Sequence, residues 1–229
     1  MADFAGFLRT TPLKPLFFGL LAALLLSGAP QDGLPRVVFS TPLGDITVEV
    51  DTRSAPVTAA NFLRYVDAGH YNYGRFNRTV RPDNQPKDAV PIELVQAVAR
   101  VDKAFPPIPL ERTSVTGLHH VDGALSMARL KPDSATSHFF ICLGNQPELD
   151  FGGRNPDGEG FAVFGRVISG LDIARRIQQS PAVGQALKPP IPITKARRLP
   201  PNGATAPRAS SAAARATTAQ GHSPNPPAK

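Results

Sequence analysis

Alternating apolar and polar positions predict two short strands at the start of the central region. The runs Val37–Thr41 and Ile46–Val50 flank Pro42-Leu43-Gly44. Proline and glycine between two alternating runs are typical of a tight turn between strands. The pattern therefore predicts a β-hairpin.

A helical period follows this hairpin. Pro56 suits the first turn of a helix, where its missing N–H costs nothing. Phe62, Leu63 and Val66 then recur at helical spacing and predict one apolar face. A helix is therefore expected to open at Ala55-Pro56 and to end at Gly69.

The remaining apolar runs are short, and they predict a mainly β domain over residues 36–199. Strands are expected at Ile92–Val95, Ala124–Met127, Phe139–Leu143, Ala162–Val167 and Ile193–Arg197. A second helix is expected from Leu171 to Gln178, after Gly170. Many short strands with only two helices indicate a mostly antiparallel barrel or sandwich.

The first 30 residues have the order of a targeting segment. Arg9 and Lys14 precede the apolar run Leu16–Leu26, which is shorter than the ~18 residues of a spanning helix. We expect a signal peptide that exports the domain to the periplasm or the extracytoplasmic face of a membrane. Pro30 directly follows Ala29 and suits signal peptidase poorly, so an uncleaved N-terminal membrane tether is one alternative, and a buried helix of the domain is another.

Residues 200–229 have a different composition from the domain. They are rich in Ala, Pro, Ser and Thr and contain no aromatic or large aliphatic side chain. Such a segment cannot bury enough apolar surface to offset the entropy of ordering. We expect a disordered tail.

Composition and charge narrow the function classes. A hydrophobic fraction of 41% supports a packed core, and the single cysteine, Cys142, excludes an internal disulfide and a thiolate metal cluster. The chain has 25 basic and 18 acidic residues, a net charge of +7. Its first and last 30 residues together hold five of the basic residues and one of the acidic ones, so the central region has a net charge of only +3. No basic stripe occurs there, and nucleic acid is not an expected partner.

The residues alone offer no strong catalytic constellation. His119 and His120 are adjacent, so on a strand their rings would point to opposite faces, and we expect surface loop residues. Ser126 has neither a GxSxG context nor an obvious base. Asn155–Glu159 lacks the ligand spacing of a calcium loop and predicts a surface turn, and Cys142 predicts a buried, inert thiol. We expect no metal and no cofactor.

Several sequence blocks nevertheless occur in one order along the domain. They are Thr41–Val50, Ala55–Phe62, Phe76–Arg78, Gly123–Ala128, Ser137–Cys142, Leu149-Asp150 and Val163–Val167. Together they resemble the cyclophilin family of peptidyl-prolyl cis-trans isomerases over nearly all of residues 37–198. The resemblance implies a cyclophilin-like eight-stranded antiparallel barrel capped by two helices, and we expect a monomer.

The resemblance also implies an active site. Arg78 falls at the family's catalytic arginine, and Gln96 falls at the glutamine that binds the substrate backbone. The matching lining of the proline pocket is Ala128, Phe140 and Leu149, with Phe161 at the position usually occupied by histidine. Because Phe139 and Phe140 face opposite ways on a strand, Phe140 could instead belong to the core.

Other positions depart from the family's pattern. The pocket aromatic expected three residues before Gln96 is Glu93, unless an inserted loop around Pro82–Pro91 moves Ile92 into its place. The position usually occupied by tryptophan is Glu148.

The implied function is rotation about X-Pro bonds of polypeptides, which assists protein folding. The alternative is a catalytically weak module that binds proline-containing segments, because Glu93 and Glu148 could make the groove polar and unfavourable for a proline ring.

Overall fold

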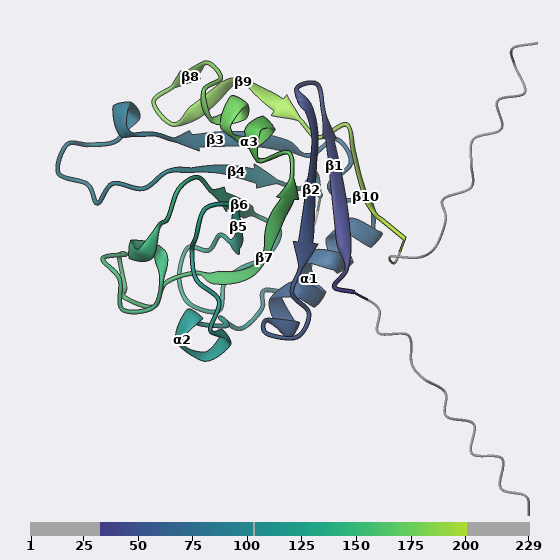
Figure 1. Ribbon diagram of the computed structural model, residues 1–229, viewed down its shortest axis with the longest axis horizontal. Coiled ribbons are helices and arrows are strands. Elements are labelled where there is room, and N and C mark those ends of the chain that lie inside the picture. The colour runs from purple at the N-terminus through teal and green to yellow at the C-terminus, as the bar shows by residue number, and fades with distance from the viewer. Residues whose placement is uncertain (1–32, 103, 201–229) are drawn as a thin grey trace, which may run out of the picture. The chain divides into compact units, whose positions relative to one another are not determined.

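The described part of the chain folds around one antiparallel sheet of ten strands (Figure 1). The structure is a computed structural model that describes residues 33–102 and 104–200. The expected leader, residues 1–30, and residues 201–229 of the expected tail lie outside the described residues. The expected mainly β, antiparallel fold is confirmed.

The elements are short, as the apolar runs predict. The strands are β1 Arg36–Thr41, β2 Gly44–Val50, β3 Arg75–Val80, β4 Leu94–Val98, β5 Ala124–Met127, β6 Phe139–Cys142, β7 Ala162–Ser169, β8 Ala182–Val183, β9 Ala186–Pro192 and β10 Lys195–Arg198. The helices are α1 Pro56–Asp67, α2 Thr113–Thr116 and α3 Leu171–Gln178, with 3-10 turns η1 Pro82–Asn84 and η2 Pro147–Leu149.

The chain passes directly from β9, next to one edge of the sheet, to β10 at the other edge. The strand order is β10-β1-β2-β7-β5-β6-β4-β3-β9-β8. Only Ile193 and Thr194 separate β9 from β10, and their backbone N–H groups donate to Gly74 beside β3 and Ser40 on β1, at 2.8 and 2.9 Å. When β9 and β10 are counted as one interrupted strand, and the short β8 is set aside, the expected number of eight strands results.

The first hairpin, α1 and α3 are confirmed within a residue or two, whereas several other elements were not expected. Strands β3, β8 and β9 and the single turn α2 had not been assigned. Strand β9 contains three prolines, which cannot donate to a ladder and argue against a strand in sequence. Strand β3 is largely polar because its outer face carries the candidate site described below.

Gly170 allows the close turn between β7 and α3. Its φ is +83°, in the left-handed region, and a Cβ there would lie 2.2 Å from the backbone oxygen of Asp45. No residue with a side chain fits this approach without moving the β1–β2 hairpin. Helix α1 packs against β7 and β10, and helix α3 packs against β2, β3 and β4 (Figure 1).

The side chains of the sheet separate into two clusters. The main core contains Phe139, whose ring stacks on Phe39 at 5.3 Å and meets Phe62 edge-on at 5.6 Å. The next residue, Phe140, belongs to a smaller cluster on the other face of the sheet, with Leu94. The alternation of a strand thus places two adjacent phenylalanines in different environments.

Replacing Phe139 by alanine should lower the free energy of unfolding by about 3–5 kcal/mol, because it opens a cavity where several aromatic rings meet. Urea unfolding followed by circular dichroism measures this loss. The matched control Val115→Ala, at a side chain that is 82% exposed, should change stability by less than about 0.5 kcal/mol. A loss below about 1 kcal/mol for Phe139→Ala would contradict this view of the core.

Candidate active site

One cavity of about 450 Å³ opens beside the smaller apolar cluster. The side chains around it come from β3, β4, β6 and the loops that follow β3, β5 and β6. They are Arg78, Val90, Ile92, Leu94, Gln96, Ala128, Arg129, Phe140, Glu148, Leu149, Arg154, Asn155, Pro156 and Phe161. All six site residues expected from the sequence are among them: Arg78, Gln96, Ala128, Phe140, Leu149 and Phe161.

The register of the sheet aligns the polar and apolar groups of this site. Arg78 on β3 pairs with Gln96 on β4, which in turn pairs with Phe140 on β6. Directly paired residues of antiparallel strands point to the same face. A row across three strands therefore presents a guanidinium, an amide and an aromatic ring side by side.

Arg78 is fixed by two amide side chains. Its Nε and Nη2 donate to Oε1 of Gln185 at 2.9 and 2.7 Å, and its Nη1 donates to Oε1 of Gln96 at 3.1 Å. A guanidinium has five N–H groups, so one N–H on each Nη atom is left for a bound molecule.

The charge of Arg78 is not neutralised by these partners, because both are uncharged amides. Partial burial lowers the pKa of Arg78, although an arginine stays protonated at any physiological pH. The site therefore presents a fixed positive charge next to an apolar surface.

Gln96 is oriented by a partner on each side. Its Oε1 accepts from Arg78, and its Nε2 lies 3.4 Å from Nδ1 of His138. Burial, and to a lesser degree the charge of Arg75, lowers the pKa of His138, so the ring is neutral at pH 7 and Nδ1 can accept. The remaining amide hydrogen of Gln96 is available to a carbonyl oxygen of a ligand.

Aromatic rings form the apolar wall. Phe140 meets Phe161 edge-on at 5.6 Å, and the guanidinium of Arg129 covers Phe161 at 4.9 Å. Arg129 is itself held by both carboxylate oxygens of Asp157 at 2.7 Å. The hydrogen bond from Arg129 holds the pKa of Asp157 at about 2, so this pair stays charged.

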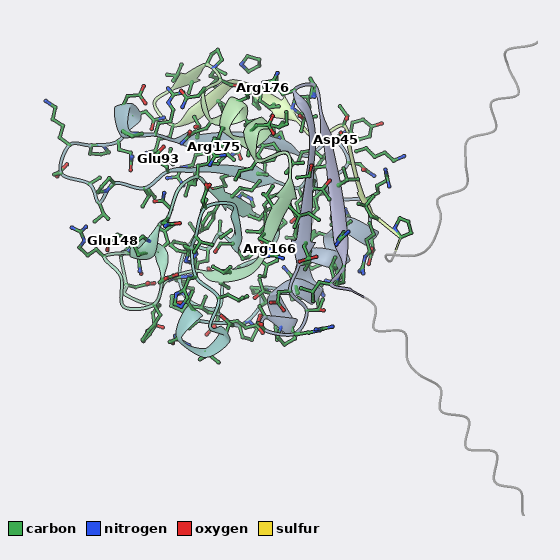
Figure 2. All side chains as sticks on the ribbon, in the orientation of Figure 1. Asp45, Glu93, Glu148, Arg166, Arg175 and Arg176 are labelled. Atoms are coloured by element: carbon green, nitrogen blue, oxygen red, sulfur yellow. The ribbon has the colours of Figure 1, made fainter. Side chains whose placement is uncertain are left out.

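The two glutamates that could have made the groove polar both accept hydrogen bonds from neighbouring residues. The Oε2 of Glu93 accepts from Nε2 of Gln178 on α3 at 3.0 Å, and Ile92 and Leu94 line the cavity instead. Glu148 lies at the rim and accepts from the backbone N–H and the guanidinium of Arg154, both at 2.8 Å. Figure 2 shows Glu148 on the outer loop and Glu93 higher, toward α3.

The expectation that His119 and His120 are both surface residues is wrong for His120. Its side chain is fully buried, whereas that of His119 is 62% exposed. Both rings bind the carboxylate of Asp150 through Nδ1, and Nε2 of His120 lies 2.9 Å from Oγ of Ser126. Ser126 thus has a base as a neighbour, which a separation of six residues in sequence did not reveal.

The other chemical candidates behave as expected. Asn155–Glu159 forms a turn closed by its own backbone and side chains. Cys142 is buried, and burial raises the pKa of its thiol far above the usual range. Within residues 33–102 and 104–200, no group of three His, Cys, Asp or Glu side chains is close enough to hold a metal ion.

Comparison with known proteins gives the site its context. The sequence model of the family described as cyclophilin type peptidyl-prolyl cis-trans isomerase matches residues 36–198. The chain belongs to this family. It is therefore a cyclophilin-type isomerase, as the sequence blocks indicated.

Curated relatives and solved structures agree. The chain is 35% identical over 145 residues to peptidyl-prolyl cis-trans isomerase A of Dickeya dadantii, covering 63% of this chain and 71% of the relative. It is 32% identical over 143 residues to isomerase B of Escherichia coli, covering 62% and 83%. The fold is similar to a cyclophilin of Cryptosporidium parvum solved in the presence of the dipeptide Ala-Pro, with a TM-score of 0.59, 20% identity, and 72% and 99% coverage.

Two supporting residues of this cyclophilin site were missed in sequence. Gln185 lies 107 residues after Arg78, in a hairpin that was not expected. His138, which was not among the predicted site residues, contacts Gln96. Both depend on long-range pairing of strands, which leaves no local signal.

Gln185→Ala should lower kcat/KM by about threefold to tenfold, because it removes one neutral hydrogen-bond partner worth roughly 0.5–1.5 kcal/mol and frees the guanidinium. Isomerisation of a short X-Pro peptide, followed by NMR exchange, measures it. The control Gln179→Ala alters an exposed glutamine of the same region without touching Arg78 and should leave the rate unchanged. Equal rates for both variants would show that Gln185 does not position Arg78.

Proposed function

We propose that this isomerase rotates X-Pro bonds of polypeptides outside the cytoplasm and assists their folding, with Arg78 as its catalytic residue. The observation that carries the residue assignment is the fixed guanidinium, with two unused N–H groups, at the edge of an apolar cavity. Gln96, Ala128, Phe140, Leu149 and Phe161 are proposed to bind the substrate.

The reaction needs no covalent step. Rotation about the X-Pro bond breaks amide resonance against a barrier of ~18–20 kcal/mol. In the twisted transition state the prolyl nitrogen is pyramidal and basic, whereas in the planar ground state its lone pair is delocalised. A donor aimed at this nitrogen therefore stabilises the transition state more than the substrate.

Arg78 meets the requirements for that donor. Its side chain stays charged, and Gln185 and Gln96 hold it from two sides before any substrate binds. A fixed fork of donors costs little reorganisation when the transition state forms. The absence of a carboxylate among its hydrogen-bond partners keeps its charge available for the prolyl nitrogen.

The rest of the cavity would hold the substrate in register. The free amide hydrogen of Gln96 suits the carbonyl oxygen before proline, and the wall of Phe140, Leu149 and Phe161 suits the apolar ring. Removing that ring from water strengthens the hydrogen bond to Arg78. A cyclophilin of similar fold was solved in the presence of the dipeptide Ala-Pro, which is the kind of X-Pro unit proposed here as substrate.

The glutamates that motivated the alternative, a weak binding module, no longer favour it. Glu93 is bonded to α3, and Glu148 is paired with Arg154 at the rim. Glu93 is thereby kept out of the cavity lining, and the charge of Glu148, which lines the cavity at its rim, is balanced by Arg154.

The location is proposed from the sequence. Arg9 and Lys14 precede the apolar run Leu16–Leu26, which is the order of an export signal. Its substrates would then be exported polypeptides, and an uncleaved leader would tether the enzyme to the membrane. The enzyme is proposed to act as a monomer.

Arg78→Ala should lower kcat/KM by roughly one to two decades, since a charge-assisted hydrogen bond contributes about 1.5–3 kcal/mol and each tenfold of rate takes about 1.4 kcal/mol. Peptide affinity should change much less, because the planar prolyl nitrogen accepts poorly. Arg78→Lys should be nearly as damaging, because a point charge on a flexible stem does not reproduce the fork. Isomerisation rate and peptide dissociation constant are measured on the same samples.

Gln96→Ala is the matched comparison for this prediction. It should weaken both affinity and rate, because Gln96 contacts the substrate backbone in every state. Full activity of Arg78→Ala would remove the catalytic assignment. A wild-type protein that binds the peptide without turnover would favour the binding module instead.

A fusion of residues 1–35 to a reporter that is active only after export should give a clear signal, because a charged start followed by an apolar run is read by the export machinery. Changing two leucines within Leu16–Leu26 to arginine should abolish the signal. A silent wild-type fusion that is well expressed in the cytoplasm would contradict the proposed location.

A further inference from the structure

A chain of three polar side chains lies behind the active-site wall. Oδ1 of Asp150 is 2.5 Å from Nδ1 of His120, and Nε2 of His120 is 2.9 Å from Oγ of Ser126. His120 is 1% exposed and Ser126 is not exposed at all. No substrate can reach this hydroxyl, so the arrangement does not serve nucleophilic chemistry despite its Asp-His-Ser composition.

The same imidazole contacts the wall of the cavity. Its ring stacks on Phe140, with centroids 5.9 Å apart and an angle of 11° between the planes. Ser126 pairs with Phe140 across β5 and β6, so the chain of hydrogen bonds ends in the row that holds Arg78 and Gln96. Phe140 thus contacts the ring of Phe161 edge-on and the ring of His120 in a stacked arrangement.

We propose that His120 is a positioning residue of this active site, which holds Phe140 in its working place while the imidazole is neutral and loosens it when the imidazole is protonated. This inference rests on the proposed function, since it assigns Phe140 to substrate binding. The ring is suited to the role because both nitrogens are engaged and its face lies against the wall.

The two protonation states of His120 require opposite hydrogen-bond directions between Nε2 and the hydroxyl of Ser126. In the neutral ring Nδ1–H donates to Asp150, and Nε2 accepts the hydroxyl proton of Ser126. In the protonated ring Nε2–H must donate to Oγ, so the hydroxyl proton has to turn away inside a site without access to water. An unsatisfied buried donor is costly, and the packing around Phe140 must shift to relieve it.

The surroundings favour the neutral ring at pH 7. Burial lowers the pKa of His120, and its effect outweighs the opposing hydrogen bond and charge of Asp150; His119 in the same loop lowers the pKa further. Strand β5 contributes only the neutral Ser126. Strand β6 contributes Phe140 and, on the same face, Cys142, whose thiol is kept neutral by burial.

The test is a pH profile of kcat/KM, measured by NMR exchange from about pH 4.5 to about pH 8 with an X-Pro peptide that carries no titratable group. In the wild type, kcat/KM should be constant at the upper end and fall by at least about threefold at the lower end, with a midpoint below 6.5. His120→Gln keeps an acceptor for Ser126 and cannot be protonated, so its acid decline should be clearly smaller than that of the wild type. Any decline that remains is assigned to His138, which contacts Gln96 and also has a lowered pKa.

His119→Gln is the matched control. His119 shares Asp150 with His120 but is largely exposed and makes no hydrogen bond to Ser126, so this variant should keep the acid decline. Near-ultraviolet circular dichroism at each pH must show a folded protein. This check is needed because a lowered histidine pKa makes the native state lose stability as pH falls below 6.5.

Two results would overturn the inference: a flat wild-type profile, or an acid decline in His120→Gln that is as large as that of the wild type. If His120→Gln does not fold, the imidazole signals of the wild type decide, because the midpoint for His120 must coincide with the kinetic midpoint. A difference between the two midpoints overturns the inference. A protein inactive at every pH would instead remove the proposed function, and this inference with it.

Discussion

The register of β3, β4 and β6 determines where the chemistry of this cyclophilin lies. Antiparallel pairing places Arg78, Gln96 and Phe140 in one row on one face of the sheet. Neighbours of these residues on the same strands, such as Phe139, point to the opposite face and fill the main core. The ladder is irregular between Phe76 and Arg78 on β3, which lets Phe76 enter the core while Arg78 faces the cavity. Elsewhere side chains alternate along the strands, so a slip of one residue would exchange the two faces. Stability and catalysis therefore depend on the same pairing.

Within that row, the decisive electrostatic feature is the charge of Arg78, which forms no ion pair with any carboxylate of residues 33–102 and 104–200. Gln185 and Gln96 hold Arg78 through amide oxygens, which fix its direction but leave its field in place. A carboxylate in either position would hold the guanidinium as firmly, but it would compete with the prolyl nitrogen for the same charge. Neutral partners thus combine rigidity with a donor that is still available to the transition state.

Features that depend on residues close together in sequence could be predicted, whereas features that depend on distant residues could not. The first hairpin, α1 and α3 are local, and turn residues and periodicity were enough to place them. The six site residues could be placed only through resemblance to a family, because nothing local distinguishes Arg78 from a surface arginine on a strand. The contacts of Gln185 with Arg78 and of His120 with Asp150 were not predicted, because strand pairing and the turn that ends at Asp150 bring these partners together.

The departures from the family's pattern have a similar explanation. Glu93 occupied a pocket position by counting back from Gln96, but the preceding loop lets Ile92 and Leu94 line the cavity while Glu93 bonds to α3. The sequence left this alternative open, and the cavity lining confirms that Ile92 takes the place of Glu93.

The aromatic wall shows how charged residues can stabilise an apolar surface. Phe161 is covered by Arg129, which Asp157 holds from the solvent side. Phe140, its neighbour, rests on the ring of His120, which is buried. The carboxylate of Asp157 offsets the cost of burying the Arg129 guanidinium, whose side chain is only 3% exposed, whereas the buried imidazole avoids such a cost by staying neutral. The wall is therefore insensitive to acid at its outer edge and sensitive at its inner edge, next to the row that binds the substrate.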